Sequence, residues 1–120
     1  MNKWIILTSA LFGAFICSSS YAVNLQFLNE SAPAYHFTDE DFSLLRSSIQ
    51  KALNENQDGE KLIWHNPKSD NRGLVKPLNT IQEKGTICRK TQLINKAKDK
   101  IAKTHYRFCK QPSGEWKVDQ

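Results

Sequence analysis

Cys88 and Cys109 enclose the most basic stretch of the chain, and their spacing limits how the residues between them can fold. Two runs rich in β-branched and aromatic residues, at 86–94 and 101–110, are separated by the polar segment "NKAKDK", which favours a turn. In an antiparallel hairpin the numbers of opposite residues add to a constant, so facing cysteines place the turn directly after Lys98. That position lies inside the polar segment. The sequence therefore predicts a hairpin whose strands carry the two cysteines opposite each other.

The first residues of the chain indicate export. A short positive segment is followed by the apolar run "WIILTSALFGAFIC" and then by the small residues "SSSYA". This order is typical of a secretory signal peptide over residues 1–22, with cleavage after Ala22. Cleavage removes Cys17, and the remaining even pair in an oxidising compartment predicts one disulfide, Cys88–Cys109. Two free buried thiols are the alternative.

This N-terminal segment has two alternative roles, and both are disfavoured. An anchor helix that stays in the membrane is disfavoured, because the apolar run is shorter than the roughly 20 residues that span a bilayer. Lipidation at Cys17 is disfavoured by the bulky Ile16 before it. After cleavage we expect an exported chain without a transmembrane helix.

The rest of the chain predicts an extended lead-in over 23–37 and one domain over 38–118. Thr38 can cap a helix while Asp41 returns the bond, and three acids occupy the first turn. Apolar side chains then recur at helical spacing at Phe42, Leu45, Ile49, Ala52 and Leu53. The segment "NENQDG", which ends at Gly59, stops the helix.

After Gly59 the pattern changes from helix to strand. Short strands are expected at 60–67, 74–79, 86–94, 101–110 and 115–118. Pro77 favours a strand end or an edge position within the second of them. The predicted fold class is therefore α+β, with one N-terminal amphipathic helix packed on an antiparallel sheet of four or five strands.

Charge divides the chain into an acidic and a basic part. Residues 23–60 hold two basic and seven acidic side chains, whereas fourteen basic and five acidic ones follow from Lys61 onward. Such a field attracts anions, and for an exported chain these are expected to be other than nucleic acid. The candidate anion-binding residues are Lys90, Lys96, Lys98, Lys100, Lys103 and Arg107. A solvated hairpin whose lysines prevent edge-to-edge pairing is the alternative.

Catalytic patterns are absent from the sequence. His36, His65 and His105 are isolated from one another, and a small hydrolase would need a pocket that joins His65 or His105 to a carboxylate. Two cysteines alone do not make a zinc site. The chain is therefore expected to be non-enzymatic, without a metal or a cofactor.

Two further groups of residues are interpreted as structural. Asp39, Glu40 and Asp41 resemble a cluster of catalytic carboxylates, but their place in the first turn of the helix explains them. Trp64 and Trp116 are interpreted as core residues rather than as ligand-stacking ones.

An ordered set of short motifs resembles a known family. The segment "WHNP" begins at Trp64, "GLVKP" at Gly73 and "CR" at Cys88, and "FC" and "QPSGEW" follow near the end of the chain. The set is similar to the C-terminal domain of the rickettsial-type 17 kDa surface antigen family, envelope proteins of Gram-negative bacteria. The resemblance covers roughly residues 38–118 and implies an exported envelope protein with a structural or binding role, with no catalytic activity to carry over. It also implies a location in the periplasm, at the outer membrane or at the cell surface, where the anions that meet the basic residues are lipid phosphates, lipopolysaccharide or an acidic protein.

Two features depart from the family pattern. Family antigens often carry a lipid on a cysteine, and Cys17 lacks a convincing lipidation signal. They also commonly have a glycine-rich, membrane-associating stretch, whereas this chain has five glycines and no such stretch. A second hypothesis is therefore a soluble periplasmic or secreted inhibitor or binding module whose basic hairpin holds an acidic partner.

Overall fold

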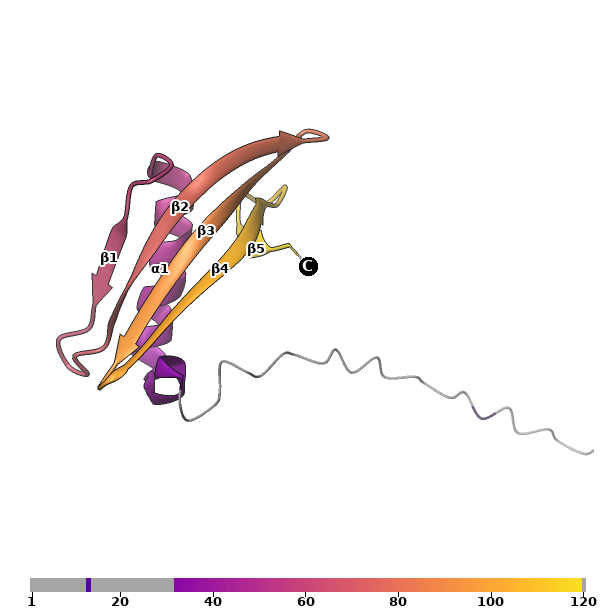
Figure 1. The fold of residues 1–120 in the computed structure, drawn as a ribbon. Coiled ribbons are helices and arrows are strands. Elements are labelled where there is room, and N and C mark those ends of the chain that lie inside the picture. Colours follow the sequence, from indigo (N-terminus) through magenta and orange to yellow (C-terminus); the bar gives the residue numbers. More distant parts are fainter. Residues whose placement is uncertain (1–12, 14–31, 120) are drawn as a thin grey trace, which may run out of the picture.

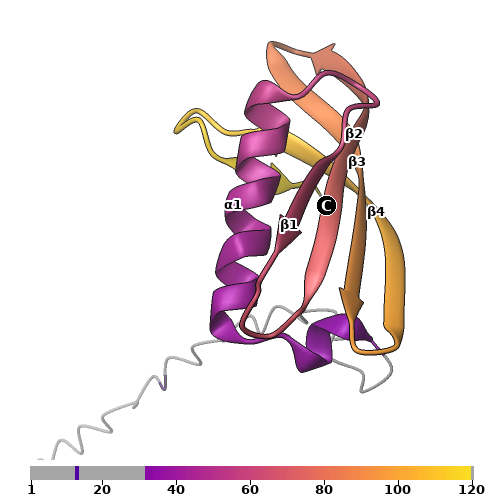
Figure 2. The same ribbon diagram turned by 90° about the vertical axis from the view of Figure 1, so that its left-hand side faces the viewer.

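One helix and one antiparallel sheet form two layers (Figure 1 and Figure 2). In the computed structural model, which describes Gly13 and residues 32–119, the sheet has five strands in the order β1-β2-β3-β4-β5. The elements are η2 (a 3₁₀ helix, Pro33–His36), α1 (Asp39–Glu55), β1 (Leu62–His65), β2 (Arg72–Glu83), β3 (Thr86–Ala97), β4 (Lys100–Lys110) and β5 (Trp116–Val118). Every neighbouring pair of strands is antiparallel. The predicted α+β class is confirmed.

A capping box begins α1, as the sequence predicted. The Asp41 backbone N–H donates to the Thr38 side-chain oxygen at 3.1 Å, and the Thr38 N–H donates to an Asp41 carboxylate oxygen at 2.8 Å. The two bonds satisfy backbone donors that the start of a helix leaves without partners. Beyond the end of α1, Gly59 adopts a φ of +86°, which glycine tolerates because it lacks a Cβ.

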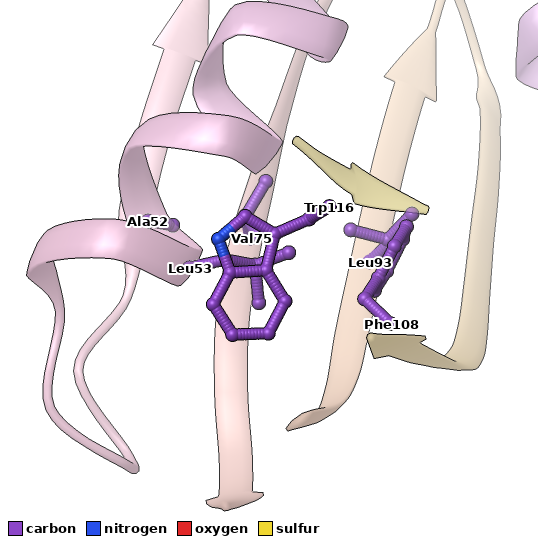
Figure 3. Packing of buried hydrophobic residues seen from close by; sticks show 6 residues of the cluster. All are labelled: Ala52, Leu53, Val75, Leu93, Phe108 and Trp116. Carbon is purple, nitrogen blue, oxygen red and sulfur yellow. The ribbon is translucent and has the colours of Figure 1, made fainter. Parts of the chain in front are cut away.

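The core lies between α1 and the middle of the sheet. Its buried cluster comprises Ala52, Leu53, Val75, Leu93, Phe108 and Trp116 (Figure 3). Trp116 also ties β5 to the helix, because its indole N–H donates to Asn54 Oδ1 and its backbone N–H and carbonyl both bond the Gln50 amide, all at 2.9 Å. Trp64 is likewise buried, so both tryptophans are packing residues.

The predicted hairpin of β3 and β4 is confirmed. Cys88 lies opposite Cys109, and the ladder continues to the pair Ala97–Lys100, which leaves Lys98 and Asp99 as the turn. The two cysteines form a disulfide with their Cα atoms 4.0 Å apart.

Strand β2 is longer than the sequence predicted. Pro77 lies inside it rather than at its end, at a β-bulge where the register with β3 shifts between Pro77 and Asn79. A bulge tolerates proline because the ladder is already interrupted there. The bulge also reverses which side chains of β2 point toward α1: Val75 does so before it, and Thr80 after it.

The residues that precede α1 pack against the sheet. Pro33–His36 form a single 3₁₀ turn next to β3 and β4, and Pro33 is buried. The expected cleavage site after Ala22 and the expected lead-in up to residue 31 lie outside the described residues. Among the residues that are described, no helix has the length and apolar character needed to cross a membrane.

Candidate functional site: the open face of the sheet

The sheet has one face toward α1 and one face that points away from it. Side chains alternate along a strand, so Leu93 in the core assigns the odd-numbered residues of β3 to the helix side. Cys88 and the other even-numbered residues of β3 then share the opposite face with Cys109 and the odd-numbered residues of β4. We call this the open face, because within residues 32–119 no helix packs on it; Figure 1 looks onto it, with α1 behind the sheet.

The structure brings together four of the six predicted anion-binding residues. Lys90, Lys96, Lys103 and Arg107 lie on the open face of β3 and β4, with Lys90 directly opposite Arg107. The other two do not join them. Lys98 lies in the turn, and Lys100 follows it on the helix side of β4.

Arg107 is already paired. Its guanidinium bonds the Glu83 carboxylate at 2.8 Å and the Asp119 carboxylate at 3.0 Å, and the hydrogen bond to Glu83 raises the pKa of Arg107 above its ordinary value. By contrast, Lys90, Lys96 and Lys103 take part in no ion pair within residues 32–119. These three lysines of β3 and β4 are therefore available to a ligand.

Sequence reasoning missed the contribution of β2. Arg72 pairs with Lys96 across the strands, and Lys76 pairs with Gln92, so both project onto the open face. Arg72 also bonds Asp70 at 3.1 Å. The spacing of Arg72 and Lys76 indicates that both side chains lie on one face of β2. Which face of the sheet this is depends on the register with β3.

A shallow cavity of about 250 Å³ lies beside the disulfide. It is lined by Asn79, Ile81, Cys88, Lys90, His105, Tyr106 and Arg107. The bulge in β2 turns Asn79 and Ile81 toward this side of the sheet. The cavity is thus part of the open face, and both basic and apolar groups line it.

Arg89 belongs to the basic stretch but is not available for binding. It is 6% exposed and reaches beneath α1, where its guanidinium donates to the Leu53 and Asn56 carbonyls at 2.8 Å each. It also bonds Asp58 at 2.9 Å and Thr80 at 2.9 Å. Arginine near the end of a helix satisfies carbonyls that have no partner within the helix.

Among the described residues, neither cavity brings His65 or His105 together with a carboxylate. His65 Nε2 lies 2.9 Å from Asp70, and this contact lowers the pKa of Asp70, but both side chains are exposed and neither lines a described cavity. His105 lines the cavity beside the disulfide, where no carboxylate joins it. Within the described residues, no three potential metal ligands gather.

The acidic cluster at the start of α1 is structural. Asp41 is fully buried and accepts hydrogen bonds from Asn66, Ser69 and Asn71 in addition to Thr38. Burial raises the pKa of Asp41, but these hydrogen bonds outweigh it and lower the value to about 2. Asp41 is therefore a carboxylate that joins α1 to the loop between β1 and β2.

Comparison with known proteins agrees with this architecture. The family model of the 17 kDa outer membrane surface antigen matches residues 51–117, from the last turns of α1 into β5. The 17 kDa surface antigens of Rickettsia prowazekii and Rickettsia conorii are 33% and 31% identical to this chain over 81 residues, which is 67% of this chain and 51% of each relative.

The chain thus spans about half the length of the curated relatives it matches. No solved structure matches it. The family is one of surface antigens and is not a known enzyme family. The match covers both cysteines, Arg89 and all but the last residue of β5, so the chain belongs to the 17 kDa outer membrane surface antigen family.

Proposed function

We propose that this chain is an exported protein of the bacterial cell envelope with a binding rather than a catalytic role. Its ligands are phosphate-bearing envelope components, such as lipid phosphates or lipopolysaccharide, held on the open face. The observation that carries the proposal is the charge of that face. Lys90, Lys96 and Lys103 lie on it without an ion pair in the described part of the chain, whereas the Glu83 and Asp119 carboxylates are bound to Arg107.

The distribution of charge between the two layers supports this proposal. The first turn of α1 carries Asp39, Glu40 and Asp41, whereas the strands that follow carry most of the basic residues. An anionic surface therefore attracts the sheet and repels the start of the helix. Membership of a surface antigen family supports a location at the outer membrane or cell surface.

The end of the hairpin favours a second candidate function. Lys98 lies in the turn and Lys100 follows it on the helix side of β4, so both present charge at the tip of the hairpin rather than on the open face. A soluble periplasmic or secreted binding module would use this tip, together with Lys96 and Lys103, to hold an acidic protein.

Export is tested by the intact mass of the protein recovered from the cell envelope without reducing agent. We expect a chain that begins at Val23 and is lighter by two hydrogens than its reduced form. A chain that begins at Cys17 with added acyl mass would make it a membrane-anchored lipoprotein. An intact Met1 with free thiols would contradict export.

Binding is tested with a charge-reversal variant and a matched control. Lys96→Glu with Lys103→Glu changes the open face, whereas Arg46→Glu with Lys51→Glu makes the same change of net charge on exposed positions of α1. We expect the first variant to lower affinity for anionic vesicles or lipopolysaccharide by more than about tenfold, and the control by less than about threefold. Binding should weaken steeply with salt. Equal losses in both variants, or no binding by the unaltered chain, would contradict the proposal.

A further inference from the structure

The open face carries exposed isoleucines as well as lysines. Ile63 in β1 is 62% exposed and Ile101 in β4 is 61% exposed, the largest values among the exposed apolar side chains in residues 32–119. Both lie on the open face, since Ile63 precedes the buried Trp64 and Ile101 pairs with Lys96. Isolated apolar residues on a surface are common, so their arrangement decides whether they have a role.

The strand register places several apolar side chains in one row. Ile63 pairs with Leu74, and Leu74 pairs with Ile94, so an apolar row crosses three strands. Neighbouring strands lie about 5 Å apart, which makes the row about 10 Å wide. At its β4 end the row meets Lys103, the partner of Ile94.

Basic side chains flank this row on both sides. The next pairs along the strands are Arg72 with Lys96 on one side and Lys76 with Gln92 on the other. The open face therefore alternates apolar and cationic groups on the scale of single side chains. This is the pattern of surfaces that lie in the interface of an anionic membrane, where apolar groups enter the headgroup region and lysines meet phosphates.

We propose that the open face docks flat on an anionic phospholipid bilayer, with Ile63, Leu74, Ile94 and Ile101 entering the headgroup region between Lys76, Lys96 and Lys103. This inference rests on the proposed function and names the partner and the contact residues. Charge complementarity favours a bilayer over a second copy of the chain, because two open faces would bring the same lysines together. A flat lipid surface also contacts all of the strands that carry the row.

The test compares two serine variants of the protein purified from the envelope, with its mass checked as above. Ile63→Ser with Ile101→Ser removes apolar groups from the open face without changing its charge. Ile87→Ser with Val118→Ser is the control, because these side chains are exposed on the helix side of β3 and β5. Binding is measured on vesicles that contain phosphatidylglycerol, and vesicles of phosphatidylcholine alone give the background.

We expect the open-face variant to bind the anionic vesicles about tenfold more weakly, and the control to stay within about threefold of the unaltered chain. Part of the unaltered chain's binding should survive high salt, because burial of apolar groups is not screened. A tryptophan introduced by Ile101→Trp should be quenched by lipids with brominated acyl chains.

Three outcomes would overturn the inference. If the open-face variant binds as well as the unaltered chain, contact is electrostatic only; the proposed function then stands on its lysine test. If sedimentation shows a dimer that Ile63→Ser dissociates, the face is an interface between copies. If the unaltered chain binds an acidic protein but no anionic vesicle, the face is a protein-binding surface. Failure to bind any anionic surface would remove the proposed function as well.

Discussion

Asp41 is a polar side chain that resembles a catalytic acid but stabilises the fold. It is buried, and its two oxygens accept four hydrogen bonds from side chains and backbone. In Asp41→Asn an amide NH₂ replaces one acceptor and faces those donors. We expect a loss of about 3 kcal/mol in the free energy of unfolding, measured by urea denaturation at neutral pH. The matched control Asp39→Asn changes an exposed acid of the same turn and should cost less than about 1 kcal/mol.

The same carboxylate makes stability depend on pH. The pKa of Asp41 is lowered to about 2 in the folded chain, so the unfolded chain binds its proton first as pH falls. Its contribution of about 2 kcal/mol is therefore complete above about pH 4 and is lost as the pH falls through about 2. Urea denaturation across this range should show that the free energy of unfolding falls with pH in the unaltered chain, and that it falls less in Asp41→Asn. Equal declines in both proteins would assign the acid sensitivity to other groups.

Gly73 is required by a close approach rather than by a turn. A Cβ at this position would lie 2.5 Å from Trp64 Nε1, 2.6 Å from the Ile94 carbonyl oxygen and 2.8 Å from Asn95 Oδ1. The Ile94 oxygen belongs to the backbone of β3 and cannot move aside without disturbing the ladder. We expect Gly73→Ala to cost more than about 2 kcal/mol in thermal or urea denaturation. Gly59→Ala meets no neighbouring atom and should cost only about 1 kcal/mol, for its positive φ.

Arg89 connects the end of α1 to the sheet. It donates to the Leu53 carbonyl of the helix and to the Asn56 carbonyl just after it. It also bonds Asp58 of the following loop and Thr80 of β2. In Arg89→Lys a single ammonium replaces the guanidinium fork and cannot reach all of these acceptors. We expect a loss of about 2–3 kcal/mol in urea denaturation and faster hydrogen exchange in the last turn of α1.

The neighbouring Lys90 supplies the control for this prediction. It is exposed and makes no ion pair among residues 32–119, so Lys90→Gln should change stability by less than about 0.5 kcal/mol. A similar loss of stability in both variants would mean that any change of a basic residue in β3 lowers stability, and that the contacts of Arg89 with the end of the helix are not the cause.

The elements themselves were largely predictable, because their signals are local. The capping residues Thr38 and Asp41 and the apolar stripe fixed the helix, and the spacing of the cysteines fixed the hairpin turn. The length of β2 was not predictable in the same way. Pro77 normally ends a strand, and only pairing with a long β3 carries the strand through the bulge.

The composition of the open face depended on strand register and burial, which local sequence patterns do not reveal. Four of the six predicted cations do share a face, and the sequence indicated this because the spacing of the cysteines predicts the register of β3 and β4. The sequence analysis missed two features of this face: the basic residues Arg72 and Lys76 of β2, and the apolar row from Ile63 to Ile94. Both depend on the strand register, because a shift by one residue would turn these side chains to the other face of the sheet. Arg89 was counted with the basic stretch because burial cannot be inferred from charge alone.

The disulfide stabilises the molecule as a whole, because it closes a loop with a sequence separation of 21 between Cys88 and Cys109. In the loop-entropy model this restricts the unfolded chain and contributes about 3 kcal/mol, a large part of the roughly 5–15 kcal/mol typical of a small domain. We expect a reductant to lower the free energy of unfolding by about this amount in urea denaturation, while the reduced chain still folds.

The core and the Arg89 contacts explain why folding should survive reduction, since none of them depends on the sulfur–sulfur bond. Cys88→Ala with Cys109→Ala is the matched variant: its stability should be close to that of the reduced chain and insensitive to the reductant. If reduction left the unfolding transition of the oxidised chain unchanged, the cross-link would not be what stabilises the hairpin. If the reduced chain failed to fold, the core and the Arg89 contacts would be too weak to hold α1 on the sheet. A reduced chain that still folds, but with a lower free energy of unfolding, would mean that packing specifies the fold. The disulfide, formed in an oxidising compartment, would then add stability to it.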